Sequence, residues 1–207
     1  MARPLRPNFI VPLTFRGFEM TPERVIAFEW RQKARIPPHM KSITIQALAD
    51  FPSLLEAHYA GIPADCKHWA PSSWDGIPSE RLTAIEQICH VRDIEVLGYL
   101  VRFRRTLSEL NPALKSLDTD ALARDRSYAT QNAEVALSEF REARSQTLAL
   151  VSGLSPEQLR RPAIFEGYGQ LSLQSLVHYL CSHDQQHLAG LQWLLGKIEA
   201  TRAPAKA

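Results

Sequence analysis

The sequence predicts an all-α four-helix bundle that follows a Pro-rich N-terminal extension. Glycine accounts for only 9 of the 207 residues, which favours helices over loop-rich folds. Beyond about residue 43, apolar residues recur at the spacing of amphipathic helices, and no segment shows the alternation typical of strands. With 45% hydrophobic and 22% charged residues, the composition is globular and excludes a wholly disordered chain.

The prolines are concentrated before the predicted bundle. Because proline fixes φ and lacks an N–H donor, this segment cannot form one long helix, although a short helix can begin at Thr21 and Pro22. We therefore expect an N-terminal extension over residues 1–42, the bundle over residues 43–198 and a flexible tail over residues 199–207. The extension carries apolar residues that suit either a dimer interface or a cover over the bundle of the same chain: Phe9, Ile10, Val11, Phe15 and Phe18.

The first two bundle helices are expected over residues 43–61 and 80–110. Pro52 kinks the first helix or begins it. Ser79 can cap the second helix, and Glu80 in its first turn is favoured by the helix dipole.

The other two bundle helices are expected over residues 130–152 and 172–196. Gly153 is a typical C-terminal stop for the third helix, and Ser155 begins a capping-box pattern that predicts a short helical turn. A further turn is expected after Asp118, within the polar connector that precedes the third helix.

Three histidines form the most informative pattern in the chain. His183 and His187 are four residues apart, so on a helix they share one face, which Leu176 and Leu180 mark as the inner face. His90 is in line with inward positions of the second helix (Ile94, Leu97 and Val101). A divalent metal bound by three imidazoles with open positions is typical of catalytic sites, and a hydrogen-bonded core cluster is the alternative. The other histidines are expected to be surface or packing residues: His39, His58, His68 and His178.

Other polar residues near these histidines are open to two interpretations. Asp93 and Asp184 can orient an imidazole or lie exposed on their helices, and Asp93 can instead accept a hydrogen bond from Arg144. Cys89 and Cys181 are expected to be packing residues rather than ligands. The basic residues near the end of the second helix are expected to be solvated: Arg102, Arg104 and Arg105.

Several functional classes find no support in the sequence. The formal net charge of +2 offers no reason to expect a nucleic-acid partner. No apolar segment approaches the roughly 18–20 residues of a membrane span, and three cysteines are too few for a disulfide framework. Glycine-rich nucleotide motifs and the α/β-hydrolase GxSxG motif are absent. We expect a cytoplasmic protein with no membrane partner.

Residues of about 45–197 resemble the DinB-like superfamily, which is also described as DinB/YfiT-like metal-dependent hydrolases. The stretches that carry the resemblance are Trp74, then His90 to Glu95, Arg126 to Ala129, Phe140 with Arg144, Tyr168 to Leu173, and His183 to Leu188. The resemblance implies a four-helix bundle, often a homodimer, with zinc or nickel held by His90, His183 and His187. It does not extend to the N-terminal extension.

The resemblance and the histidine pattern lead to one functional hypothesis and one alternative. We expect a metal-dependent hydrolase or thiol S-transferase that activates water, or a low-molecular-weight thiol cosubstrate, for attack on a small-molecule substrate. No catalytic residue beyond the three ligands is assigned, and no glutamate is expected in the site. The alternative is a non-catalytic, metal-stabilised binding module, which would be favoured if Asp184 or Cys89 filled a fourth ligand position.

Overall fold

The computed structural model describes the backbone of residues 38–202 and the side chains of residues 43–202. The short helix expected at Thr21 and Pro22 lies outside these residues, as do the apolar residues expected at an interface or cover (Phe9, Ile10, Val11, Phe15 and Phe18). The division of the chain at residues 42 and 198 stays a prediction.

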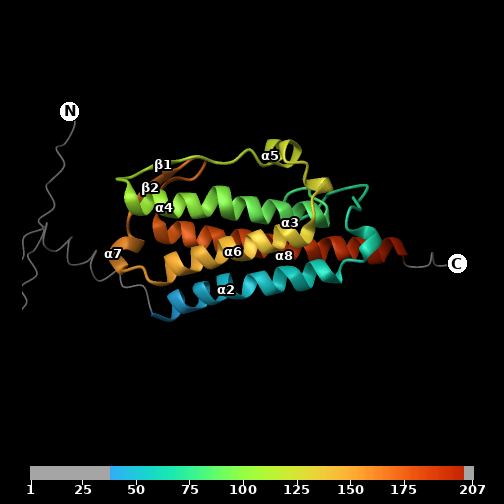
Figure 1. The fold of residues 1–207 in the computed structure, drawn as a ribbon, viewed down its shortest axis with the longest axis horizontal. Coiled ribbons are helices and arrows are strands. Elements are labelled where there is room, and N and C mark those ends of the chain that lie inside the picture. Colours follow the sequence, from blue (N-terminus) through green and yellow to red (C-terminus); the bar gives the residue numbers. More distant parts are fainter. Residues whose placement is uncertain (1–37, 203–207) are drawn as a thin grey trace, which may run out of the picture. The chain divides into compact units, whose positions relative to one another are not determined.

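Four long helical segments pack side by side, which confirms the predicted four-helix bundle (Figure 1). Helices α2 and α3 each pack against both α6 and α8. The core between them is built from apolar side chains that are almost fully buried, including Phe51, Leu55, Ile88, Phe140 and Leu191. The four segments are α2 (Pro38–Gly61), α3 (Ala84–Asp93) with its continuation, α6 (Ala133–Ser152) and α8 (Leu173–Arg202).

The second segment is not one continuous α-helix. After α3, residues Ile94–Tyr99 form a π-helix, η2, and Leu100–Ser108 form α4. Because a π-turn inserts one extra residue, it rotates everything that follows relative to an α-helix. Val101, which was expected to face inward, is therefore 41% exposed, whereas Tyr99 and Phe103 are buried.

The start of α3 also differs from the prediction. Thr83 is the N-cap, and the Glu86 carboxylate accepts hydrogen bonds from the Thr83 N–H (2.8 Å) and hydroxyl (2.7 Å). This reciprocal cap begins the helix at Ala84 rather than near residue 80. Glu80 consequently lies in the preceding loop and not in a first helical turn.

A small sheet lies beside the bundle, contrary to the expectation of no strands. Strand β2 (Pro162–Phe165) pairs in parallel with β1 (Ala113–Leu114) and antiparallel with β3 (Gly169–Ser172). These strands are too short for a periodic signal in the sequence. Gly167 and Gly169 both have positive φ, which glycine adopts readily, and they form the bend of the β2–β3 hairpin.

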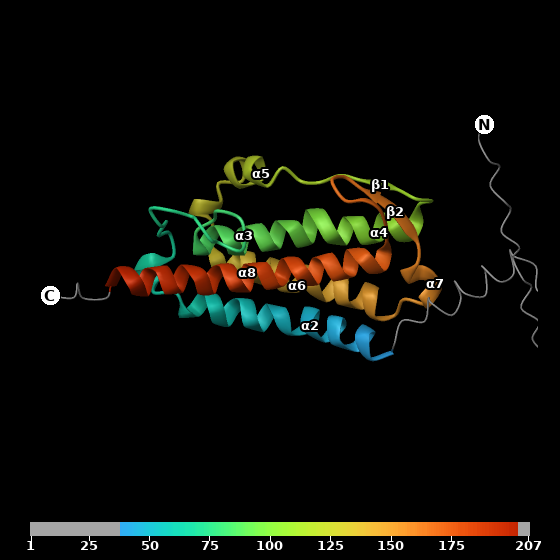
Figure 2. The same ribbon diagram turned by 180° about the vertical axis from the view of Figure 1, so that it is seen from behind.

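The connections contain short helices, seen from behind in Figure 2. The turn expected after Asp118 is α5 (Thr119–Asp125), and that expected after Ser155 is α7 (Pro156–Leu159). Two single 3₁₀ turns, η1 (Ala64–Cys66) and η3 (Tyr128–Thr130), complete the described chain. Among residues 38–202, no helix has both the length and the apolar character that crossing a membrane requires.

Candidate metal centre

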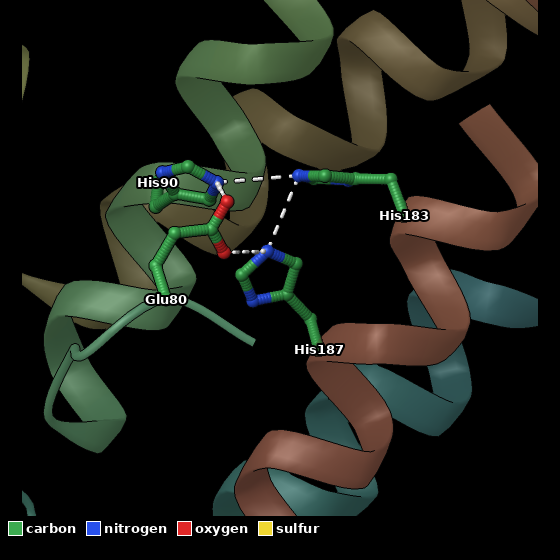
Figure 3. Close-up of side chains that lie close together, drawn as sticks. All are labelled: Glu80, His90, His183 and His187. Carbon is green, nitrogen blue, oxygen red and sulfur yellow. Dashed lines mark hydrogen bonds and ion pairs between the residues drawn. The ribbon is translucent and has the colours of Figure 1, made fainter. Parts of the chain in front are cut away.

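Four side chains from three elements converge on one another (Figure 3). His90 comes from α3, His183 and His187 come from α8, and Glu80 comes from the loop before α3. Each offers one ligand atom, and these four atoms all lie within 4.8 Å of one another. The structure thus brings together the three histidines singled out from the sequence and adds a carboxylate.

The spacing of the imidazole nitrogens fits a metal ion. Nε2 of His183 lies 3.2 Å from Nε2 of His90 and 3.2 Å from Nε2 of His187. Tetrahedral zinc–nitrogen bonds of about 2.0–2.1 Å place two ligand nitrogens about 3.3 Å apart. The donor set therefore has both the chemistry and the spacing of a three-histidine metal site.

Glu80 is the residue of the cluster that the sequence pattern does not single out. Its Oε2 lies 3.2 Å from Nε2 of His187, and its Oε1 lies 3.6 Å from Nε2 of His90. The expectation that no glutamate occupies the site was wrong, because the cap at Thr83 leaves Glu80 in the loop and facing the histidines. The Thr83–Glu86 capping pattern is the sequence signal that could have placed Glu80 there.

Gln87 determines which nitrogen of His187 is free. Nδ1 of His187 lies 3.1 Å from Oε1 of Gln87, and the orientation of this amide is supported by its Nε2, which donates to the Leu82 carbonyl at 3.4 Å. Because the amide oxygen only accepts, Nδ1 carries the proton and Nε2 presents its lone pair to Glu80. Two acceptors in contact need a proton or a metal ion between them, and an orienting hydrogen bond of this kind is typical of metal-binding histidines.

The surroundings favour the ligand form of the imidazoles. Burial and the neighbouring histidines lower the pKa of His90 well below its usual value, and burial likewise lowers the pKa of His187. Burial opposes ionisation of Glu80, but a hydrogen bond from His187 and positive charge at His90 lower the pKa of this carboxyl well below its usual range when these imidazoles carry the proton. When a metal ion takes the place of that proton, the cluster combines the neutral nitrogen donors of His90 and His187 with an ionised carboxylate.

Asp93 does not act in the way expected from the sequence. Its carboxylate accepts hydrogen bonds from Arg92 Nε (2.9 Å), Arg126 Nη1 (2.7 Å) and the Tyr128 hydroxyl (2.6 Å). It neither orients an imidazole of the cluster nor pairs with Arg144. Asp93 instead ties α3 to the segment that leads into α6.

Asp184 is the residue that Arg144 binds. Arg144 donates to Asp184 (2.7 and 3.0 Å), to Glu95 (3.1 and 2.9 Å) and to the Leu48 carbonyl (3.0 Å). Oδ1 of Asp184 is 4.0 Å from Nδ1 of His183, which is too long for a hydrogen bond. Asp184 therefore does not fill a fourth ligand position.

The cysteines do not belong to the metal cluster either. Cys89 is buried with its Sγ 3.8 Å from the Tyr128 carbonyl, and burial raises the pKa of this thiol to about 11. Burial also raises the pKa of Cys181. Among the described side chains, His58, His68 and His178 also lie outside the cluster.

One of the three arginines expected at a solvated helix end is buried. The guanidinium of Arg102 lies over the rings of Tyr99 (5.2 Å) and Phe165 (4.5 Å) and donates to the Lys115 carbonyl at 3.0 Å. The rotation caused by η2 turns Arg102 toward the sheet. Arg105, in contrast, pairs with Glu109 at the surface, as expected.

Comparison with known proteins agrees with this architecture. A profile of the DinB superfamily matches residues 47–191. Among solved structures, the chain is similar to YfiT from Bacillus subtilis, with 21% identity, a TM-score of 0.69, and coverage of 79% of this chain and 90% of that one. YfiT is described as a probable metal-dependent hydrolase with an unusual four-helix bundle topology, and at this identity the likeness shows the shared fold. No curated protein matches the chain.

Proposed function

This chain belongs to the DinB superfamily, and we propose that it is a metal-dependent hydrolase that holds a divalent metal through His90, His183 and His187. The observation that carries the proposal is the convergence of three imidazole Nε2 atoms beside an ionised carboxylate. The description of YfiT as a probable metal-dependent hydrolase supports the same assignment. Three imidazole donors suit zinc or nickel, which are therefore the metals we propose.

A divalent ion held by three protein ligands supplies Lewis-acid chemistry and lowers the pKa of a water or thiol bound to it. Glu80 is placed to act on the proton of that nucleophile, since its carboxylate is ionised and contacts both His90 and His187. We assign it the role of general base, which holds the proton at Oε1 or Oε2 and returns it to the leaving group. Gln87 keeps His187 in the tautomer that this arrangement requires.

A thiol can replace water as the nucleophile without any change in these roles. Assays for the purified protein are therefore ester or amide hydrolysis and thiol consumption with electrophiles, each with and without added Zn²⁺ or Ni²⁺. Metal-dependent turnover in the first assay supports hydrolysis, and turnover only in the second supports thiol S-transfer.

Glu80 also supports the competing proposal of a non-catalytic binding module. Its oxygens lie close enough to the imidazole nitrogens to supply a fourth ligand, and four protein ligands close a zinc site. Catalysis requires that Glu80 acts on the nucleophile, whereas a binding module requires that it holds the ion.

The variant Glu80→Gln separates the two proposals. If Glu80 is a general base, the variant should keep nearly all of its bound metal, while its turnover falls by about 10²–10⁴-fold. Glu199→Gln, an exposed change elsewhere on α8, is the control and should alter neither quantity. Loss of bound metal in Glu80→Gln, together with no turnover in the unchanged protein, would favour the binding module.

A further inference from the structure

An aromatic cluster extends from the metal centre toward the surface; it consists of Tyr99, Phe165, Tyr168 and Tyr179. Tyr99 is the inner member, with its ring centroid 6.3 Å from that of His183. Tyr179 lies four residues before His183 on α8, so the two side chains share one face of the helix. Tyr99 and Tyr179 thus both lie next to His183, so the aromatic cluster begins at this proposed metal ligand.

The outer members of the aromatic cluster are held against one another at the surface. Tyr168, at the bend of the β2–β3 hairpin, stacks on Phe165 with centroids 4.7 Å apart and approaches Tyr179 to 4.9 Å. Tyr168 is nevertheless 58% exposed and Tyr179 is 38% exposed. Exposed apolar rings gathered in one place, rather than scattered singly, are typical of a binding surface.

Arg102 fixes the inner and outer parts of the cluster to each other. Its buried guanidinium lies over the rings of both Tyr99 and Phe165, which joins η2 to the hairpin. Because Tyr168 stacks on Phe165, this contact of Arg102 also holds the Tyr168 ring in place, although Tyr168 lies in a hairpin bend. Rigid aromatic rings bind a ligand at a smaller entropic cost than mobile ones.

The Tyr99 hydroxyl offers the cluster a hydrogen-bond donor. Tyr99 is only 6% exposed. Burial raises the pKa of Tyr99 above its usual range, so the hydroxyl keeps its proton. A protonated phenol can donate a hydrogen bond to a ligand.

We propose that the aromatic cluster binds an aromatic ring of the substrate, so that the bond to be cleaved lies next to that ring. This inference rests on the proposed function, since it takes the metal centre as the place where the bond is cleaved. Tyr168 and Tyr179 contact the ring, and Tyr99 contacts the part of the substrate nearest the metal.

The test compares three hydroxamates that bind a metal through the same group. Acetohydroxamate has no ring, cyclohexanecarbohydroxamate has a saturated ring and benzohydroxamate has an aromatic one. Calorimetry on the metal-loaded full chain should give benzohydroxamate a Kd lower than that of the saturated analogue by about fivefold, as expected for aromatic pairs. This preference should disappear in Tyr168→Ala and Tyr179→Ala and persist in Tyr168→Phe, while the Kd of acetohydroxamate stays unchanged.

The outcomes separate this inference from the proposed function. If acetohydroxamate binds but the unchanged protein does not prefer the aromatic ring, or if both alanine variants keep the preference, the aromatic cluster is not a substrate site and the proposed function is unaffected. If the protein holds stoichiometric metal and binds none of the three compounds, the metal has no open position. In that case both the inference and the proposed function are overturned.

Discussion

Oε2 of Glu80 lies 3.2 Å from Nε2 of His187, although one residue comes from a loop and the other from the last helix. Since Gln87 holds the His187 proton on Nδ1, the contact brings a carboxylate against a nitrogen lone pair. Such a pair is stable only with a proton or a metal ion between the two atoms. The contact between Glu80 and His187 thus places the proposed metal centre between the loop before α3 and helix α8.

Gln87→Leu should weaken metal binding without removing a ligand. The change deletes the partner of His187 Nδ1 and leaves both the tautomer and the ring orientation unrestrained. Loss of such a partner typically lowers metal affinity about 10–100-fold. Competition with a chelator of known affinity measures the effect, and Gln146→Leu on the exposed face of α6 is the control. An unchanged affinity in Gln87→Leu would show that Gln87 does not orient the ligand.

Gly190→Ala should disturb the metal centre from outside it. A Cβ at Gly190 would lie 2.3 Å from Oγ of Ser79 and 2.8 Å from Oε1 of Gln87, so the side chains of Ser79, next to Glu80, and of Gln87, which orients His187, must move. We expect a loss of stability of about 1–3 kcal/mol and a weaker metal site.

The control for this change lies on the same helix. A Cβ added at Gly196 would have no neighbouring atom within 4 Å, so Gly196→Ala should stabilise the protein by up to about 1 kcal/mol. Thermal unfolding and metal titration measure both variants. Adding Ser79→Ala to Gly190→Ala removes the closest clash and should recover part of the loss. Equal behaviour of the two glycine variants would contradict the role of Gly190.

Arg144→Met should destabilise the bundle strongly. Arg144 on α6 binds Glu95 of η2, Asp184 of α8 and the Leu48 carbonyl of α2, so its removal leaves two buried carboxylates without a cation. Breaking such a buried pair costs about 3–5 kcal/mol. Urea unfolding measures the loss.

An exposed arginine on the same helix provides the comparison for Arg144. Arg141→Met breaks only a surface pair with Glu56 and should cost less than about 1 kcal/mol. Replacing Glu95 by Gln and Asp184 by Asn in the Arg144→Met background should restore much of the stability. A mild effect of Arg144→Met alone would show that the network is not needed for stability.

Cys89 should resist alkylation in the folded protein. Its pKa of about 11 leaves, by the usual titration relation, on the order of one thiolate in a thousand at pH 8, and the side chain is fully buried. Peptide mapping after iodoacetamide treatment should find Cys89 labelled only after unfolding. Because its pKa is raised, the contribution of Cys89 to stability is present below pH 9.0 and declines as the pH rises toward about 11. Rapid labelling of the folded protein would contradict this.

The sequence predicted those features that depend on local pattern. The spacing of His183 and His187 indicated a shared inner face, and the position of His90 placed it in the same core. The proline and capping patterns near Ser155 and Asp118 located short helices that the structure contains. Periodicity and capping act within a few residues, so one sequence is enough to detect them.

Features that depend on a register shift or on distant contacts could not be predicted. The extra residue of the π-helix η2 turns Val101 out of the core and brings Tyr99 and Phe103 into it. Nothing in the spacing of the apolar residues in α4 indicates this extra residue. The same rotation buries Arg102 against Phe165, whose strand is defined only by pairing with its neighbours. Glu80 was placed wrongly for a local reason: two possible caps lie close together, and the helix is capped at Thr83, where Glu86 completes the capping box.

Metal analysis of the purified protein tests the proposed metal centre most directly. We predict about one equivalent of zinc or nickel in the unchanged protein, a strong loss in His187→Ala, and no loss in His178→Ala, which removes an exposed histidine from the same helix. Circular dichroism on each variant checks that the bundle remains folded. Equally low metal in all three proteins after incubation with Zn²⁺ or Ni²⁺, with the helices intact, would contradict the metal centre.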